Sequence, residues 1–153
     1  MDPVAALVAG IGLPAAATLL GLLLRSRDGR VRAAPALPSA AGDVAALGLP
    51  PGALGGDVTL VQFSTAYCSR CPGTARALGE LARAYAADVR HVEVDLTDDA
   101  SLADRFDVRQ TPTVLVLDSA GRTAGRIAGV PRTHELRTLI DDLTRRNRVH
   151  QHA

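Results

Sequence analysis

Hydrophobic positions change their period along the chain, and each change marks an expected element. Val58–Phe63 is apolar on both faces, which is typical of a central strand covered by helices on each side. From residue 68 the period becomes helical. The apolar positions at the i, i+3, i+4 and i+7 spacing are Leu78, Leu81, Ala82 and Tyr85. Pro72 fits this helix only in its first turn, where backbone N–H groups lack intrahelical partners, so we expect the helix to begin close to Cys68.

The rest of the pattern continues the alternation of strands and helices. It predicts a strand at Val89–Asp95, a short helix at Asp99–Phe106, strands at Thr113–Leu117 and Thr123–Ala128, and a last helix from Thr133. The last two strands are expected to be antiparallel because the turn between them is short. The predicted order is β-α-β-α-β-β-α, which places the domain in the α/β class.

The N-terminal segment differs from the rest of the chain. Val4–Leu24 has no ionisable side chain, and at about 1.5 Å per helical residue it is long enough for a hydrocarbon core of roughly 30 Å. We therefore predict a transmembrane anchor over residues 1–24. A cleaved signal peptide would need a positive region before it, whereas only Met1, Asp2 and Pro3 precede it. A buried core helix would show a polar face.

Charges beside this segment predict its orientation. Four arginines follow it directly: Arg25, Arg27, Arg30 and Arg32. No basic residue precedes it, so the positive-inside rule favours a single-pass membrane protein with its soluble domain on the cytoplasmic side. The extracytoplasmic face is the alternative.

The remaining boundaries follow from composition. Residues 25–56 are rich in Ala, Gly and Pro and are expected to form a tether, with a short apolar element around Val44–Leu49. Residues 57–146 form the predicted domain, and residues 147–153 look like a polar tail. The 17 basic and 16 acidic residues nearly balance, which argues against nucleic acid as a partner.

The two cysteines, Cys68 and Cys71, are three residues apart at the predicted start of a helix. Such a pair could be redox-active, part of a metal site or a packing accident. Helix geometry places an i, i+3 pair about 5 to 6 Å apart, within reach of a disulfide. Cys68 would be the exposed, attacking thiolate near the helix N-terminus, and Cys71 the shielded thiol that resolves the mixed disulfide. A zinc site is disfavoured because the histidines show no matching spacing.

Three local features make this sequence resemble the thioredoxin family. They are Phe63 followed by an aromatic residue and CxxC (residues 67–71), the run at Leu102–Arg122 and Gly129 before the last helix. The resemblance covers roughly residues 56–146. It implies a thioredoxin-like fold with a central mixed sheet flanked by helices. It also implies a thiol–disulfide oxidoreductase with protein disulfide substrates and a separate electron-donating reductase. Nothing resembles a flavin or nicotinamide site, so no cofactor is expected.

The resemblance also implies a substrate groove. The Thr111–Pro112 bond should be cis and pack against the active-site disulfide. The backbone of Thr111 would pair with an extended substrate segment, and Gly129 would lie on the rim of the same groove. Tyr67 would present a flat apolar surface beside Cys68.

Two departures from the family pattern concern the thiols. Arg70 lies between the cysteines and is expected to stabilise thiolate, which would make the disulfide a stronger oxidant. Gln62 stands where thioredoxins carry a buried acid, and an amide accepts no proton. We hypothesise that His91 hydrogen-bonds to Gln62 beneath Cys71 and serves as the base. The alternative is a purely structural His91.

Two other functions remain compatible with the sequence. One is a redox sensor or substrate-binding module of the same fold with little turnover. The other is an extracytoplasmic disulfide isomerase or a thioredoxin of cytochrome maturation.

Overall fold

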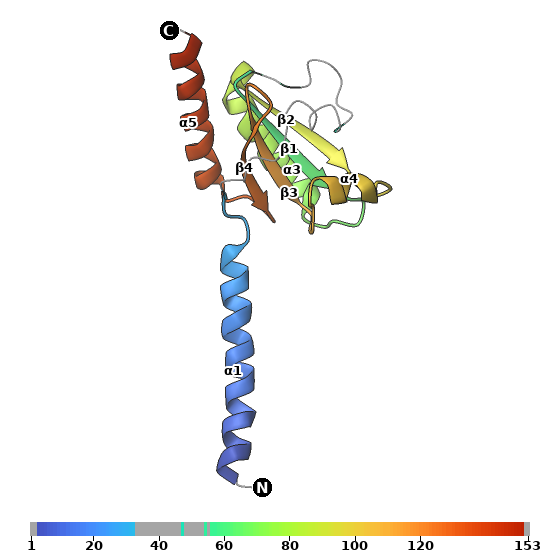
Figure 1. Ribbon diagram of the computed structural model, residues 1–153, viewed down its shortest axis with the longest axis vertical. Coiled ribbons are helices and arrows are strands. Elements are labelled where there is room, and N and C mark those ends of the chain that lie inside the picture. Colours follow the sequence, from blue (N-terminus) through green and yellow to red (C-terminus); the bar gives the residue numbers. More distant parts are fainter. Residues whose placement is uncertain (1–2, 33–46, 48–53, 55, 152–153) are drawn as a thin grey trace.

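The computed structural model describes residues 3–32, 47, 54 and 56–151 (Figure 1). Its elements are α1 (Pro3–Arg27), β1 (Val58–Ser64), α3 (Cys71–Ala84), a 3₁₀ turn (Ala86–Asp88), β2 (Val89–Asp95), α4 (Ala100–Arg105), β3 (Thr113–Asp118), β4 (Thr123–Ala128) and α5 (Thr133–Gln151). Apart from the 3₁₀ turn, the order after residue 57 is the predicted β-α-β-α-β-β-α.

The four strands form one mixed sheet in the order β2-β1-β3-β4. β1 pairs with β2 in parallel, whereas the β1–β3 and β3–β4 pairs are antiparallel. Every residue of β1 is buried, as expected for a strand with apolar residues on both faces. The carboxyl ends of β1 and β2 therefore meet at one edge, where the cysteine loop begins.

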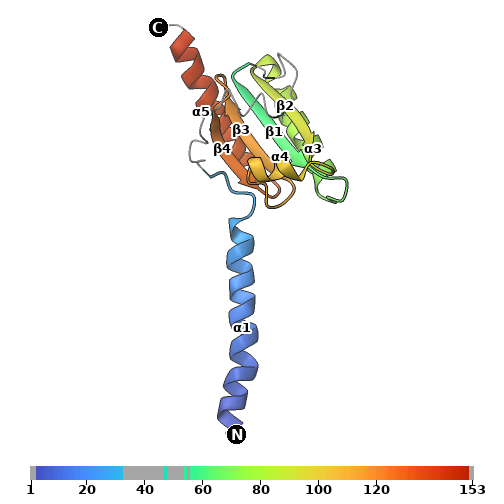
Figure 2. The same cartoon turned by 45° about the vertical axis from the view of Figure 1, so that its right-hand side comes forward.

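Side chains on the two faces of the sheet form two hydrophobic clusters, because successive strand residues point to opposite sides. On one face Leu60 and Val116 pack with Leu78 of α3 and Ile140 of α5. On the other face the cluster includes residues of β1 and β3 together with Phe106, next to α4. The sheet thus lies between α3 and α5 on one side and α4 on the other (Figures 1 and 2).

Helix α1 covers the predicted anchor and projects away from the domain (Figures 1 and 2). Its side chains from Gly10 to Leu23 are exposed. Over the residues that the structure describes, no helix is long and apolar enough to cross a membrane. The anchor predicted at Val4–Leu24 is therefore not confirmed.

Part of the predicted tether is packed against the domain. Asp28–Arg32, here called the strap, runs beside the end of β4, and Arg32 forms an antiparallel bridge with Arg126. The Gly29 N–H donates to the Ala128 carbonyl at 2.8 Å. Of the apolar element around Val44–Leu49, Leu47 is described, and it is buried in the cluster that contains Phe106. Most of the remaining tether lies outside the described residues.

The C-terminal boundary also differs from the prediction. α5 continues to Gln151 through residues expected to be a polar tail. Asn147 donates a side-chain hydrogen bond to Asp57 at the start of β1, and Arg148 forms an ion pair with Asp88. These contacts with the domain explain why the helix extends beyond its last apolar position.

Candidate active site

Cys68 and Cys71 form a disulfide with their Cα atoms 5.4 Å apart. The helix begins later than expected: α3 starts at Cys71, and Cys68 lies in the preceding turn. Two hydrogen bonds close this turn. The Cys68 N–H donates to the Thr65 carbonyl, and the Cys71 N–H donates to the Cys68 carbonyl. Pro72 then occupies the first helical turn, where its missing N–H costs nothing.

The two sulfurs differ in accessibility. Cys68 is partly exposed, whereas Cys71 is only 2 % exposed. Cys71 is the first residue of α3, and its side chain is shielded there. An incoming sulfur can therefore approach Cys68 and not Cys71.

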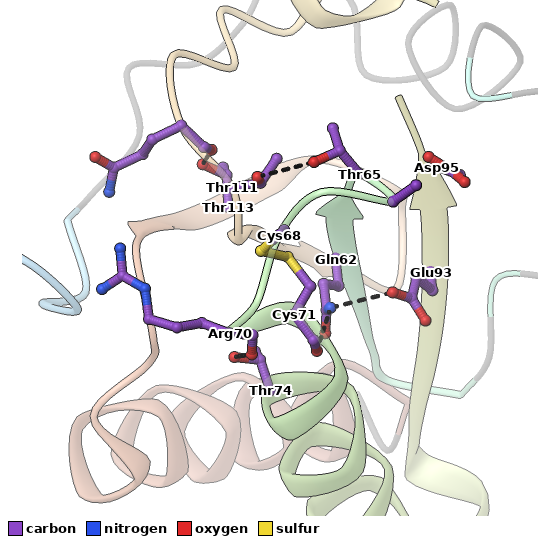
Figure 3. Close-up of a disulfide and its surroundings, with 12 residues drawn as sticks. Gln62, Thr65, Cys68, Arg70, Cys71, Thr74, Glu93, Asp95, Thr111 and Thr113 are labelled. Atoms are coloured by element: carbon purple, nitrogen blue, oxygen red, sulfur yellow. Dashed lines mark hydrogen bonds between the residues drawn. A yellow bond between two sulfur atoms is a disulfide. The ribbon is translucent and has the colours of Figure 1, made fainter. Parts of the chain in front are cut away.

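The cis peptide bond expected at Thr111–Pro112 is present. Pro112 is buried, and the Thr111 hydroxyl lies 3.4 Å from the hydroxyl of Thr65, in the loop that leads to Cys68 (Figure 3). Gly129, with φ of +88°, donates its N–H to the Pro112 carbonyl at 2.8 Å. The residues expected to border the groove, Thr111, Pro112 and Gly129, are thus joined to one another and to the cysteine loop.

Gln62 lies beneath the disulfide and connects two elements. It is fully buried, and its Nε2 donates to the Cys71 carbonyl at 3.1 Å and to Glu93 Oε1 at 3.3 Å (Figure 3). Its Oε1 is buried without a hydrogen-bond partner in the described part of the chain. The hydrogen bond hypothesised between Gln62 and His91 is not the one found, because the β1–β2 register pairs Gln62 with Glu93.

His91 lies opposite Leu60 in the same register. The imidazole is partly buried, and its Nε2 has no hydrogen-bond partner among the described residues. Burial lowers the pKa of His91 below its ordinary 6.5, and the nearby Glu93 carboxylate opposes this with a smaller effect. Its structural environment therefore does not support the predicted role as the base beneath Cys71.

Two exposed side chains flank the disulfide. Tyr67 is 89 % exposed and forms part of the surface next to Cys68, as predicted. Arg70 precedes α3, and its guanidinium extends away from the sulfurs (Figure 3). Solvent screens a charge in that position, which reduces the effect on the thiolate expected from the sequence.

An open pocket of about 450 Å³ lies on the side of the disulfide that faces β2. Its lining residues are Ser64, Thr65, Ala66, Cys68, Cys71, Pro72, Glu93 and Asp95. The Asp95 carboxylate accepts hydrogen bonds from the hydroxyl and the N–H of Thr97, and these lower its pKa. Neither acid was singled out from the sequence, although the alternation of β2 and its pairing with β1 place both beside the cysteines.

Comparisons with known proteins agree with this architecture. The thioredoxin family profile matches residues 55–142. Thioredoxin M5 of rice chloroplasts is 32% identical over 82 residues, covering 54% of this chain and 47% of that protein. Thioredoxin C-2 of Corynebacterium nephridii is 32% identical over 82 residues, covering 54% of this chain and 75% of that protein. The chain thus spans about half the length of the rice relative.

Solved structures show the same likeness. A malarial protein superposes with a TM-score of 0.50 at 25% identity, covering 57% of this chain and 97% of that one. A second structure, thioredoxin-2 from the malaria parasite, gives a TM-score of 0.50 at 26% identity over 56% of this chain and 82% of that one. With its family profile match, mixed sheet and CxxC disulfide beside a cis-proline, this chain belongs to the thioredoxin family.

Proposed function

We propose that this protein is a thiol–disulfide oxidoreductase that reduces disulfides in protein substrates. The observation that carries the proposal is the Cys68–Cys71 disulfide, with one accessible and one shielded sulfur. The contact between the hydroxyls of Thr65 and Thr111, which joins the cysteine loop to the expected groove, supports the same function.

The reaction follows from the accessibility of the two sulfurs. In the reduced protein the Cys68 thiolate attacks one sulfur of the substrate disulfide and forms a mixed disulfide, while the other substrate sulfur leaves as a thiolate. The Cys71 thiolate then attacks the Cys68 sulfur and expels the second substrate thiolate. Two electrons pass to the substrate, and the protein keeps the Cys68–Cys71 disulfide. A separate reductase must return those electrons.

The groove residues support binding of an extended substrate segment. Thr111 and Pro112 lie next to the cysteine loop, and Gly129 is hydrogen-bonded to Pro112. The substrate backbone would pair with Thr111, while the exposed Tyr67 ring would contact apolar side chains next to the target disulfide.

Cysteine variants test this function in an insulin reduction assay driven by dithiothreitol. Cys68→Ser is expected to lower the rate to the uncatalysed background, because it removes the accessible nucleophile. Reduced Cys71→Ser that has been freed of dithiothreitol and mixed with insulin is expected to accumulate a mixed disulfide between Cys68 and the substrate, visible on a non-reducing gel. Wild-type protein that does not accelerate insulin reduction would contradict the proposal and favour a binding or sensing role.

We also propose that α1 tethers this activity to a membrane, with the domain on the cytoplasmic side. The support is the uncharged sequence of Val4–Leu24 and the arginines that follow it. Alkaline carbonate extraction of the full chain is expected to leave it in the membrane pellet. Release of the protein into the supernatant would refute the tether. Proteolysis of sealed vesicles of both orientations reports the side of the membrane on which the domain lies.

A further inference from the structure

The proposed function leaves one chemical requirement open, which is the destination of the Cys71 proton. The resolving step needs Cys71 as a thiolate, yet its side chain is only 2 % exposed. The nearest polar side chain beneath it is the amide of Gln62, which is not a base. A base must therefore come from another element.

We propose that the carboxylate of Glu93 accepts the Cys71 proton, held in place by the hydrogen bond from Gln62. This inference rests on the proposed oxidoreductase function. It assigns to β2 a role for which the sequence suggested His91.

Two hydrogen bonds and a shared pocket connect the Glu93 carboxylate with Cys71. Gln62 Nε2 donates both to the Cys71 carbonyl and to Glu93 Oε1, so one buried side chain joins the two residues (Figure 3). Glu93 and Cys71 also line the same open pocket of about 450 Å³. A pocket of that size has room for several water molecules, each needing about 30 Å³, and water can carry a proton over the remaining distance.

The side-chain oxygen of Gln62 fits the same arrangement. Its Oε1 is buried and accepts no hydrogen bond from the described residues, a state that costs free energy. Reduction of the disulfide gives Cys71 an S–H group, a donor that the oxidised protein lacks. The Nε2 of Gln62 meanwhile holds Glu93 at the edge of the pocket through which water carries the proton.

The other titratable groups near the pocket are less suited. Asp95 lines it too, but its carboxylate is occupied by Thr97, whose hydrogen bonds lower its pKa and make it a weaker base. His91 lies on the same strand as Glu93, and its Nε2 is buried. Among the described lining residues, Glu93 and Asp95 are the charged ones.

The step balances as follows. The Cys71 S–H bond breaks, its proton passes through water to Glu93, and its electron pair stays on sulfur. That sulfur forms the bond to Cys68 while the bond between Cys68 and the substrate breaks, and the substrate leaves as a thiolate. Glu93 later returns the proton to solvent through the open pocket.

The test measures the release step by itself. Reduced protein is mixed with a peptide disulfide in a rapid-quench experiment, which separates formation of the mixed disulfide from its resolution. For Glu93→Gln we expect unchanged formation and a release rate lower by on the order of 100-fold near neutral pH. The deficit should shrink as the pH rises, because at high pH the Cys71 thiol ionises without the base.

Control variants separate a proton acceptor from a structural residue. Glu93→Asp should recover part of the release rate, and Gln62→Asp combined with Glu93→Gln should recover it by supplying an acid beneath Cys71. Glu80→Gln, an exposed charge change on α3, should release substrate at the wild-type rate. Asp95→Asn keeps an acceptor for Thr97 and should retain most of the rate.

Different results would contradict the oxidoreductase function and the role of Glu93. If wild-type protein forms no mixed disulfide, the oxidoreductase function fails. If it does, and Glu93→Gln releases substrate with the wild-type rate and pH profile, Glu93 is not the acceptor. A loss in Asp95→Asn without a loss in Glu93→Gln would move the role to Asp95 and overturn the inference.

Discussion

The partly buried imidazole of His91 links one side chain to the pH dependence of stability. Because burial lowers its pKa in the folded state, the unfolded chain binds a proton at higher pH than the folded chain does. The free energy of unfolding should therefore fall as the pH drops below about 6.5, until the folded imidazole is protonated as well.

His91→Gln is expected to reduce this pH dependence. Urea unfolding at about pH 7.5 and about pH 5.5 measures it, with a smaller shift of the midpoint in the variant than in the wild type. His134→Gln, at an exposed position on α5, is the matched control and should keep the wild-type shift. An unchanged shift in His91→Gln would assign the acid sensitivity to other groups.

Among single residues, sequence analysis identified those whose motif lies within a few neighbouring positions. Cys68 and Cys71 are nearly adjacent, so their chemistry could be predicted without knowing the fold, whereas the role of Thr111–Pro112 followed from the resemblance to the thioredoxin family. Glu93 could not be found in this way, because its contact with Gln62 depends on the register between β1 and β2. His91, the hypothesised partner of Gln62, lies two residues before Glu93, the observed partner, on the same strand.

Among the elements, α4 depends on a side chain from β4. The guanidinium of Arg126 donates to the carbonyls of Phe106 and Asp107 at 2.7 and 2.6 Å, where α4 ends. A cation at this position satisfies carbonyls that lack helical partners and interacts favourably with the helix dipole. It also fixes the start of the loop that leads to Pro112.

Arg126→Met should lower the free energy of unfolding by about 1 to 3 kcal/mol, because it leaves these carbonyls without their charged donor. Urea unfolding provides the measurement. Arg122→Met removes an exposed ion pair with Asp118 on the preceding turn and should cost less than about 1 kcal/mol. Equal losses in the two variants would show that Arg126 does not support α4.

Element boundaries were harder to predict than element order. Periodicity located every strand after residue 57, but it placed the start of α3 near Cys68 because Pro72 is compatible with any position in the first turn. The polar end of α5 carries no apolar period. It is held by contacts with Asp57 and Asp88, which are distant in the sequence.

For the whole molecule, the mixed sheet and its two covered faces followed from the pattern of apolar residues. The strap did not, because Asp28–Arg32 has a single large apolar residue, Val31, no period, and lies next to Ala- and Pro-rich sequence. Its pairing is determined by backbone groups at the edge of β4, which the sequence of the strap does not reveal.

The strap has a consequence for the distance over which the protein can act. The Gly29 N–H donates a hydrogen bond to the carbonyl of Ala128. The next residue, Gly129, donates its N–H to the carbonyl of Pro112 in the active-site groove. Helix α1 therefore leaves the domain at the catalytic end (Figures 1 and 2). While the strap is paired with β4, the disulfide can react only with partners that lie within a short radius of the end of α1. A partner held within that radius meets it at high effective concentration, whereas a freely diffusing partner gains nothing from the attachment.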